Sequence, residues 1–282
     1  MVTTALYRWV QRYPGHVEAF ETVGALARPT PRQRSHALVI IPAWNEQDAL
    51  PGTLTELQRV RPDLDVVVIS DGSTDNTAAI ARSFGVTVAE LPFNLGIGGA
   101  LQTGFRYAVR HGYSRAVQFD ADGQHDPNEI ATLFASLDAG ADMVVGTRFG
   151  EGGTVEYRVG PVRRGAMLVL RFMMNTMTHS QFSDTSSGFR AFDRRVLNLF
   201  AAQYPVEFMD STESLLTVCN AGLKVVEAPT VIRERQAGTP STRHFRLVFH
   251  YLRLIVTMVA QWSFRRPQSV PTILAQGGEE RP

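Results

Sequence analysis

The sequence predicts an α/β fold in which helices flank a mostly parallel β-sheet. Short runs rich in β-branched residues recur along the chain, and segments of helical length lie between most of them. Because these runs are apolar through their middles, they are typical of strands covered on both faces. Strands that alternate with helices indicate right-handed βαβ crossovers, which place ligands at the carboxyl ends of the strands.

The expected elements follow one another in a regular order. The strands are the runs ALVIIP, DVVVIS, VTVAEL, RAVQFD and ADMVVG. The helices are expected at residues 47–60, 75–84, 98–111 and 127–139. Beyond Gly150 the pattern changes, and further helical stretches are expected at 162–178 and 210–221.

We expect one α/β domain, residues 37–242, between two extensions. Residues 1–36 end in ARPTPRQRSH, whose prolines and arginines are typical of a linker. Residues 243–266 are expected to form an amphipathic helix. Residues 267–282 carry proline, glycine and charge without periodicity, which is typical of a disordered tail.

The composition excludes several classes of protein. A net charge of +1 gives no general attraction to nucleic acid. No uncharged apolar stretch reaches the roughly 18 residues of a spanning helix, and Arg8 and Arg12 interrupt any N-terminal signal peptide. The single cysteine, Cys219, suits a reducing compartment, although a secreted protein without disulfides would look the same. We therefore expect a cytoplasmic protein.

Acidic and amide side chains follow three of the expected strands, in IIPAWNE, ISDGSTDNT and FDADGQHD. In the last of these, four such side chains stand on alternate residues and would repel one another on a continuing strand. A divalent cation that holds a phosphate-bearing ligand would compensate for this repulsion, and a solvated turn would avoid it. Hard oxygen ligands of this kind are those that Mg²⁺ or Mn²⁺ prefers.

Some of these residues have simpler roles. Asp75 and Asp126 precede expected helices, so we interpret both as helix caps. Asp71 ends its strand before that cap and is expected to accept hydrogen bonds from a ribose or a base. His125, a lone histidine, is interpreted as a surface-loop residue. The glycines of NLGIGGAL lack the spacing of a dinucleotide fingerprint, and serve either ligand approach or helix packing.

Seven motifs in one order resemble family 2 glycosyltransferases of the dolichyl-phosphate mannose synthase type. They are PAWNE, DGSTDNT, NLGIGGAL, DADGQHDP, GTRF, SDTSSGFRAF and RERQAG. The resemblance covers about Ala37 to Ser241. It implies a GT-A fold, with a Rossmann-like sheet, and a second half that builds the acceptor side.

The resemblance also implies the roles of individual residues. The nucleotide-sugar pocket would be lined by Pro42, Asn45, Glu46, Asp71, Asp120 and Arg148. A Mg²⁺ or Mn²⁺ ion would be surrounded by Asp120, Asp122 and Gln124. The catalytic residues would be Asp184, Asp122 and Arg235. Acceptor and phosphate groups would meet Arg190, Arg235 and Arg243, although each arginine is also compatible with an ordinary ion pair.

The sequence departs from the family in the loop that follows RERQAG. Pro240 occupies the place of an expected serine, Ser241 follows it, and no lysine is present there. Arg243 is the candidate substitute for that lysine. The departure concerns acceptor contacts and not the donor site.

The implied reaction is inverting transfer of a sugar from a GDP- or UDP-linked donor to a polyprenyl or dolichyl phosphate. A hydroxyl acceptor would require a general base, for which Asp184 and Glu213 are the candidates. Two alternatives remain open. One is a soluble glycosyltransferase that acts on a small hydroxylated or phosphorylated acceptor, and the other is a non-catalytic nucleotide-sugar-binding scaffold.

The expected helix at 243–266 bears on the acceptor. It would carry a narrow basic stripe beside a wide aromatic and aliphatic face. Such a helix suits peripheral contact with the inner face of the cell membrane, and equally suits packing on the catalytic domain or on a second subunit of an oligomer.

Overall fold

The computed structural model describes residues 36–147, 161–178, 182–185, 187–205, 210–231 and 233. The expected linker, C-terminal helix and tail lie outside these residues, as do Arg148, Arg235 and Arg243. Among the helices that are described, none has both the length and the apolar character needed to cross a membrane.

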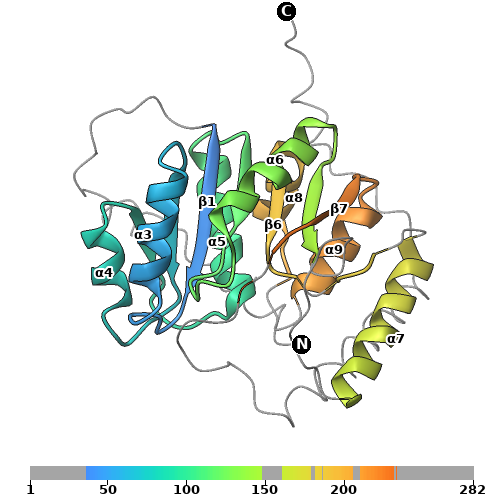
Figure 1. Cartoon of the computed structure of the whole chain (residues 1–282), viewed down its shortest axis with the longest axis horizontal. Coiled ribbons are helices and arrows are strands. Elements are labelled where there is room, and N and C mark those ends of the chain that lie inside the picture. Colours follow the sequence, from blue (N-terminus) through green and yellow to red (C-terminus); the bar gives the residue numbers. More distant parts are fainter. Residues whose placement is uncertain are drawn as a thin grey trace, which may run out of the picture. The chain divides into compact units, whose positions relative to one another are not determined.

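The described part of the chain contains a seven-stranded sheet with the order β3-β2-β1-β4-β6-β5-β7 (Figure 1). Its strands are β1 (Ala37–Ala43), β2 (Asp65–Ser70), β3 (Thr87–Glu90), β4 (Arg115–Gln118), β5 (Met143–Thr147), β6 (Arg190–Asp193) and β7 (Val225–Pro229). Every neighbouring pair is parallel except those of β6, which runs antiparallel to both β4 and β5.

Helices cover both faces of the sheet (Figure 1). They are α3 (Leu50–Val60), α4 (Thr77–Ser83), α5 (Ile97–Arg110), the short 3₁₀ helix η1 (Pro127–Glu129), α6 (Ile130–Asp138), α7 (Pro161–Thr178), α8 (Arg194–Ala202) and α9 (Asp210–Asn220). Strand β1 shows why these runs are apolar throughout, because its alternate side chains are buried on opposite faces of the sheet. Leu38 and Ile40 pack in the core with α5 and α8, whereas Val39 and Ile41 pack in the core with α3 and α6. Full burial of each such side chain contributes about 2 kcal/mol.

The expected α/β architecture is confirmed, with differences in detail. All five expected strands are present, as are the helices expected between residues 47 and 221. Strand β3 lies at the sheet edge and is half exposed, so it is not covered on both faces as we predicted. Strands β6 and β7 and helix α8 were not predicted, because RAFD and VVEAP are short runs that include charged residues.

The antiparallel strand β6 determines where the site can form. Its first residue, Arg190, pairs with Gln118 at the end of β4 and with Val145 near the end of β5. The segment that enters β6 therefore meets the loop that leaves β4 at one edge of the sheet. This edge holds the carboxyl ends of the parallel strands, where ligands bind in such folds.

Candidate active site

Hydrogen bonds join the loops that follow β1 and β2. The backbone N–H of Asn45 donates to Ser73 Oγ at 3.2 Å, and the N–H of Thr74 donates to Asn45 Oδ1 at 2.8 Å. Asn45 has a left-handed backbone (φ 54°), which asparagine tolerates better than most residues. Pro42 is buried in β1, and the N–H of Glu46 donates to Thr77 Oγ1 at 2.9 Å. The structure thus brings the PAWNE and DGSTDNT motifs together.

Asp71 is buried beneath the glycine-rich loop that precedes α5. Its Oδ1 accepts a hydrogen bond from the backbone N–H of Leu95 at 2.7 Å. Burial raises the pKa of Asp71, although hydrogen bonds from the Leu95 and Gly96 amides oppose the shift. A Cβ on Gly72 would lie 2.5 Å from the backbone N of Asn94, so only glycine allows this approach.

Of the glycines in NLGIGGAL, Gly99 serves helix packing. A Cβ on Gly99 would lie 2.5 Å from Cβ of Leu95, which folds back on the first turn of α5. Further along the helix, a Cβ on Gly104 would lie 2.3 Å from Cγ2 of Ile40 in β1. These contacts favour the packing alternative for both residues.

His125 is buried, with 4% of its surface exposed, so our interpretation of it as a surface-loop residue was wrong. Its ring stacks on Phe189 at 4.6 Å between centroids, and its Nδ1 accepts from the backbone N–H of Asp120 at 3.1 Å. A neutral imidazole that accepts at Nδ1 carries its proton on Nε2, which lies 3.5 Å from Asp120 Oδ2. His125 therefore contacts both the backbone and the side chain of Asp120.

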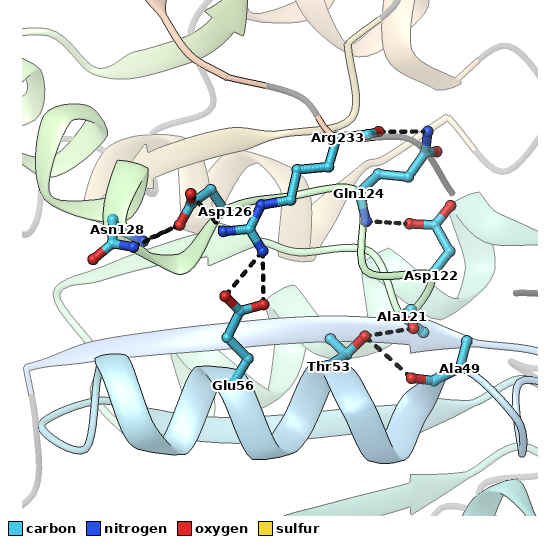
Figure 2. A network of polar contacts seen from close by, with 9 residues as sticks. All are labelled: Ala49, Thr53, Glu56, Ala121, Asp122, Gln124, Asp126, Asn128 and Arg233. Carbon is cyan, nitrogen blue, oxygen red and sulfur yellow. Dashed lines mark hydrogen bonds and ion pairs between the residues drawn. The ribbon is translucent and has the colours of Figure 1, made fainter. Parts of the chain in front are cut away.

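The acidic side chains after β4 lie on a turn and not on a continuing strand. Asp122 Oδ1 accepts from the backbone N–H of Gln124 at 3.1 Å across Gly123, whose φ is 75°. The Gln124 side-chain Nε2 donates to the backbone oxygen of Arg233 at 3.4 Å (Figure 2). Asp126 caps η1, as predicted, by accepting from the Asn128 N–H at 2.9 Å. The residue directly before α4 is Asn76, and Asp75 accepts from the N–H of Thr77, the first residue of that helix, at 2.9 Å.

Asp184 lies in the segment that enters β6, with 1% of its surface exposed. The carboxylate of Glu227 in β7 accepts hydrogen bonds from the backbone N–H of Asp184 at 2.9 Å and from that of Ser183 at 2.8 Å. It also accepts from Ser183 Oγ at 2.7 Å. In the same segment, a Cβ on Gly188 would lie 3.2 Å from Asp120 Oδ2, so this segment contacts the acidic turn directly.

Arg190 lies elsewhere than we expected. Only 1% of its surface is exposed, and its guanidinium donates to the backbone oxygens of Ser187 and Ser211, both at 2.7 Å, and to Ser214 Oγ at 2.9 Å. A further bond reaches the backbone oxygen of Thr185 at 3.3 Å. Instead of facing a phosphate, Arg190 fastens the Asp184 segment to α9, because buried carbonyl groups need donors that water cannot supply.

The acidic turn fits a cation that takes part of its coordination from a ligand. Asp120 and Asp122 supply hard carboxylate oxygens, and Gln124 Oε1 is the remaining oxygen of an amide whose nitrogen is engaged. No group of three or more His, Cys, Asp and Glu side chains able to hold a metal occurs within the described ranges. Two carboxylates completed by phosphate oxygens and water match the usual Mg²⁺ environment.

Long-range partners of the site were not predicted from the sequence. They are Thr53, Glu56, Glu227 and Arg233, together with Phe189, which stacks on His125. No local spacing signals such contacts, because each partner is far away in the sequence.

Comparison with known proteins decides the family. The family described as Glycosyl transferase family 2 matches residues 38–200. The chain belongs to glycosyltransferase family 2.

Characterised relatives of this glycosyltransferase share about a third of its sequence. Polyprenol monophosphomannose synthase from Mycolicibacterium smegmatis is 32% identical over 86% of this chain and 90% of its own. Undecaprenyl-phosphate mannosyltransferase from Micrococcus luteus is 30% identical over 71% of this chain and 85% of its own. The resemblance to polyprenyl-phosphate sugar synthases is thereby confirmed.

A solved structure shares the fold of this glycosyltransferase at low identity. Glucosyl-3-phosphoglycerate synthase from Mycobacterium tuberculosis, in complex with Mn²⁺, UDP-glucose and phosphoglyceric acid, aligns with a TM-score of 0.63 and 18% identity. The match covers 85% of this chain and 87% of that one, and it confirms a GT-A-like fold.

Proposed function

We propose that this family 2 enzyme transfers a hexose, with inversion and metal dependence, from a GDP- or UDP-linked sugar to a polyprenyl or dolichyl phosphate. The observation that carries the proposal is the contact of two segments at one sheet edge. The acidic turn with Asp120 and Asp122 meets the segment that holds Asp184, since Gly188 of that segment approaches Asp120. Residues 37–242 form the catalytic domain in this proposal.

The donor side is formed by the loops after β1 and β2. Pro42, Asn45, Glu46 and Asp71 are proposed to meet the nucleoside, with Arg148 near its phosphates. Asp71 accepts a hydrogen bond from the Leu95 N–H at 2.7 Å, and the remaining lone pairs of its carboxylate would accept from a sugar hydroxyl or a base. Asp120, Asp122 and Gln124 would hold Mg²⁺ or Mn²⁺. When bound, that cation would neutralise the charge that develops on the leaving diphosphate.

The acceptor side requires little proton chemistry. A phosphate monoester has a second pKa near about 6, so a lipid phosphate is mostly ionised at neutral pH and attacks without a strong base. We assign to Asp184 the orientation of this acceptor, and to Arg235 and Arg243 contact with phosphate oxygens. A hydroxyl acceptor would instead need Asp184 or Glu213 as its base.

The names of the relatives support the lipid acceptor. Besides the two mannosyltransferases, a relative from Methanococcus voltae that is 28% identical is named UDP-N-acetylglucosamine--dolichyl-phosphate N-acetylglucosaminyltransferase. These names differ in the sugar but share a polyprenyl-type phosphate or alcohol. Peripheral contact of residues 243–266 with the inner face of the cell membrane is part of this proposal. Deletion of residues 244–282 should then abolish co-sedimentation with anionic vesicles.

The proposal is tested with full-length protein and a panel of donors and acceptors. GDP-mannose, UDP-glucose and UDP-N-acetylglucosamine are each offered with polyprenyl phosphate or with 3-phosphoglycerate, with and without EDTA. We expect transfer to the lipid phosphate from one nucleotide class, and loss of transfer with EDTA. Transfer only to 3-phosphoglycerate would favour the small-acceptor alternative, and donor binding without any turnover would favour the scaffold.

A further inference from the structure

Arg233 joins three segments that are far apart in the sequence (Figure 2). Its Nη1 donates to both carboxylate oxygens of Glu56 in α3, at 2.9 and 2.8 Å, and its Nη2 donates to Asp126 Oδ2 at 2.6 Å. Its backbone N–H donates to the backbone oxygen of Gln124 at 2.9 Å. Gln124 returns the contact through its side-chain amide. Side chain and backbone of Arg233 thus hold the acidic turn together.

Helix α3 contacts the acidic turn at two points, one helical turn apart. Thr53 Oγ1 donates to the backbone oxygen of Ala121 at 2.8 Å in a buried contact. Glu56, three residues further on, lies on the same face of α3 and binds Arg233. The helix therefore holds the beginning of the turn directly and its end through Arg233, as Figure 2 shows.

These ion pairs differ from ordinary surface pairs. The side chains of Arg233, Glu56 and Asp126 are exposed by only 31%, 26% and 18%. An isolated exposed pair contributes little, but a guanidinium that binds two carboxylates at once is geometrically constrained and forms a network.

The turn needs such support because it carries both proposed carboxylate ligands. Asp120 and Asp122 repel each other when no cation is bound, and a turn held only by its own backbone would relax away from the binding geometry. Groups that hold ligands in place commonly affect metal affinity about 10–100-fold without touching the metal. Arg233 contacts Gln124 and Asp126 directly, and Gln124 in turn donates its backbone N–H to Asp122.

We propose that Arg233 is a positioning residue that clamps the acidic turn to α3 and so preorganises it for the divalent cation. The inference rests on the proposed function and deepens it, because it concerns the same cation site. Arg233 itself touches neither cation nor donor in this account. Its side chain acts by joining Asp126 to Glu56, and its backbone binds Gln124.

The test measures Mn²⁺ binding to the full chain, with GDP or UDP present, by electron paramagnetic resonance of the free ion. In Arg233→Gln we expect the Mn²⁺ Kd to rise about tenfold, with the KM for Mn²⁺ rising in parallel and kcat at saturating Mn²⁺ nearly retained. Arg233→Lys should bind Mn²⁺ almost as weakly as Arg233→Gln, because an ammonium group cannot bind two carboxylates in the way that the planar guanidinium does. Asp126→Asn keeps an N-cap residue while it removes the ion pair, and should raise the Kd in the same direction.

Arg115→Gln is the matched control. Arg115 is exposed to a similar extent, 33%, and pairs with Asp138 at 3.0 Å, away from the acidic turn. The Mn²⁺ Kd of Arg115→Gln should equal that of the wild type. Thermal unfolding establishes that each variant folds. If Arg233→Gln does not fold, the Mn²⁺ Kd of Asp126→Asn tests the clamp instead.

Two results would overturn the inference, and they can be told apart. If the wild type binds Mn²⁺ but the folded Arg233 and Asp126 variants bind it equally well, the clamp is rejected and the proposed function stands. If the wild type itself binds no Mn²⁺ with either nucleotide, the metal dependence of the proposed function fails, and the clamp fails with it.

Discussion

Glu227 accepts a hydrogen bond from the backbone N–H of Asp184 at 2.9 Å, across 43 residues of sequence. The same carboxylate binds the N–H and the hydroxyl of Ser183. This bond fixes the backbone from which the buried Asp184 side chain extends. Glu227 therefore supports the proposed catalytic residue without being one.

Replacing Glu227 by alanine should lower kcat/KM for sugar transfer about 100-fold, the loss typical of a misplacement near 1 Å. Glu227→Gln keeps an oxygen for the two N–H groups and should recover much of the activity. Glu90→Ala, at the end of strand β3, serves as the control and should behave as wild type. Steady-state kinetics on folded protein provide the measurement, and full activity in Glu227→Ala would refute the anchoring role.

Asp71 should show opposite effects on stability and on binding. Burial raises its pKa above that of the unfolded chain, so the ionised form costs free energy in the folded state, and stability is lost as pH rises through the folded pKa. Asp71→Asn keeps an acceptor for Leu95 and removes the charge. We expect a melting temperature at pH 7.5 equal to or above that of the wild type.

The same Asp71→Asn variant should bind the nucleotide-sugar at least about tenfold more weakly, because a charged acceptor makes the stronger hydrogen bond. Thermal shift and isothermal titration with the donor measure the two effects. A variant that loses stability but binds donor normally would show that Asp71 is purely structural.

Two helix-capping aspartates should respond to neutralisation in opposite directions. Asp193 caps α8 by accepting from the Val196 N–H at 2.9 Å. Burial and then the nearby Asp142 carboxylate raise the pKa of Asp193 to about 6. Its contribution to stability is therefore present below about pH 4 and lost as pH rises toward 6. The pKa of Asp126 is lowered instead, because hydrogen bonds outweigh burial, so its contribution is present at neutral pH.

Asp193→Asn should raise the melting temperature at pH 7.5 by about 2–4 °C, the shift expected for about 1 kcal/mol in a chain of this size. Asp126→Asn should lower it at the same pH. Thermal unfolding between pH 4.5 and 7.5 gives both comparisons, and the Asp193 difference should shrink as the pH falls. A melting temperature of Asp193→Asn below that of the wild type at pH 7.5 would contradict the raised pKa of Asp193.

The sequence predicted the elements whose pattern follows directly from burial. Strands β1, β2, β4 and β5 lie between two helical layers, and their apolar runs reflect this. Strand β6 escaped prediction because RAFD is four residues long and begins with an arginine that turns inward. Its antiparallel insertion is a tertiary feature that no local pattern encodes.

For the site, the motifs indicated which residues meet, and the structure added what holds them. The ends of β1, β2 and β4 are adjacent because parallel strands share one edge, so the acidic and amide clusters were predictable. Arg190 was misplaced because a guanidinium near a motif suggests phosphate, whereas burial commits this one to carbonyl groups. His125 and Arg233 depend on contacts between distant segments and could not be read from spacing.

The proposed function depends on a divalent cation that Asp120 and Asp122 would hold together with the donor diphosphate. The most direct measurement is the affinity of GDP and UDP for the full chain, by isothermal titration with and without Mn²⁺, in the wild type and in the Asp120→Asn/Asp122→Asn double variant. We predict that Mn²⁺ tightens binding of one nucleotide at least about tenfold in the wild type, or about 1.4 kcal/mol, and not in the variant. Equal tightening by Mn²⁺ in both proteins would contradict the account.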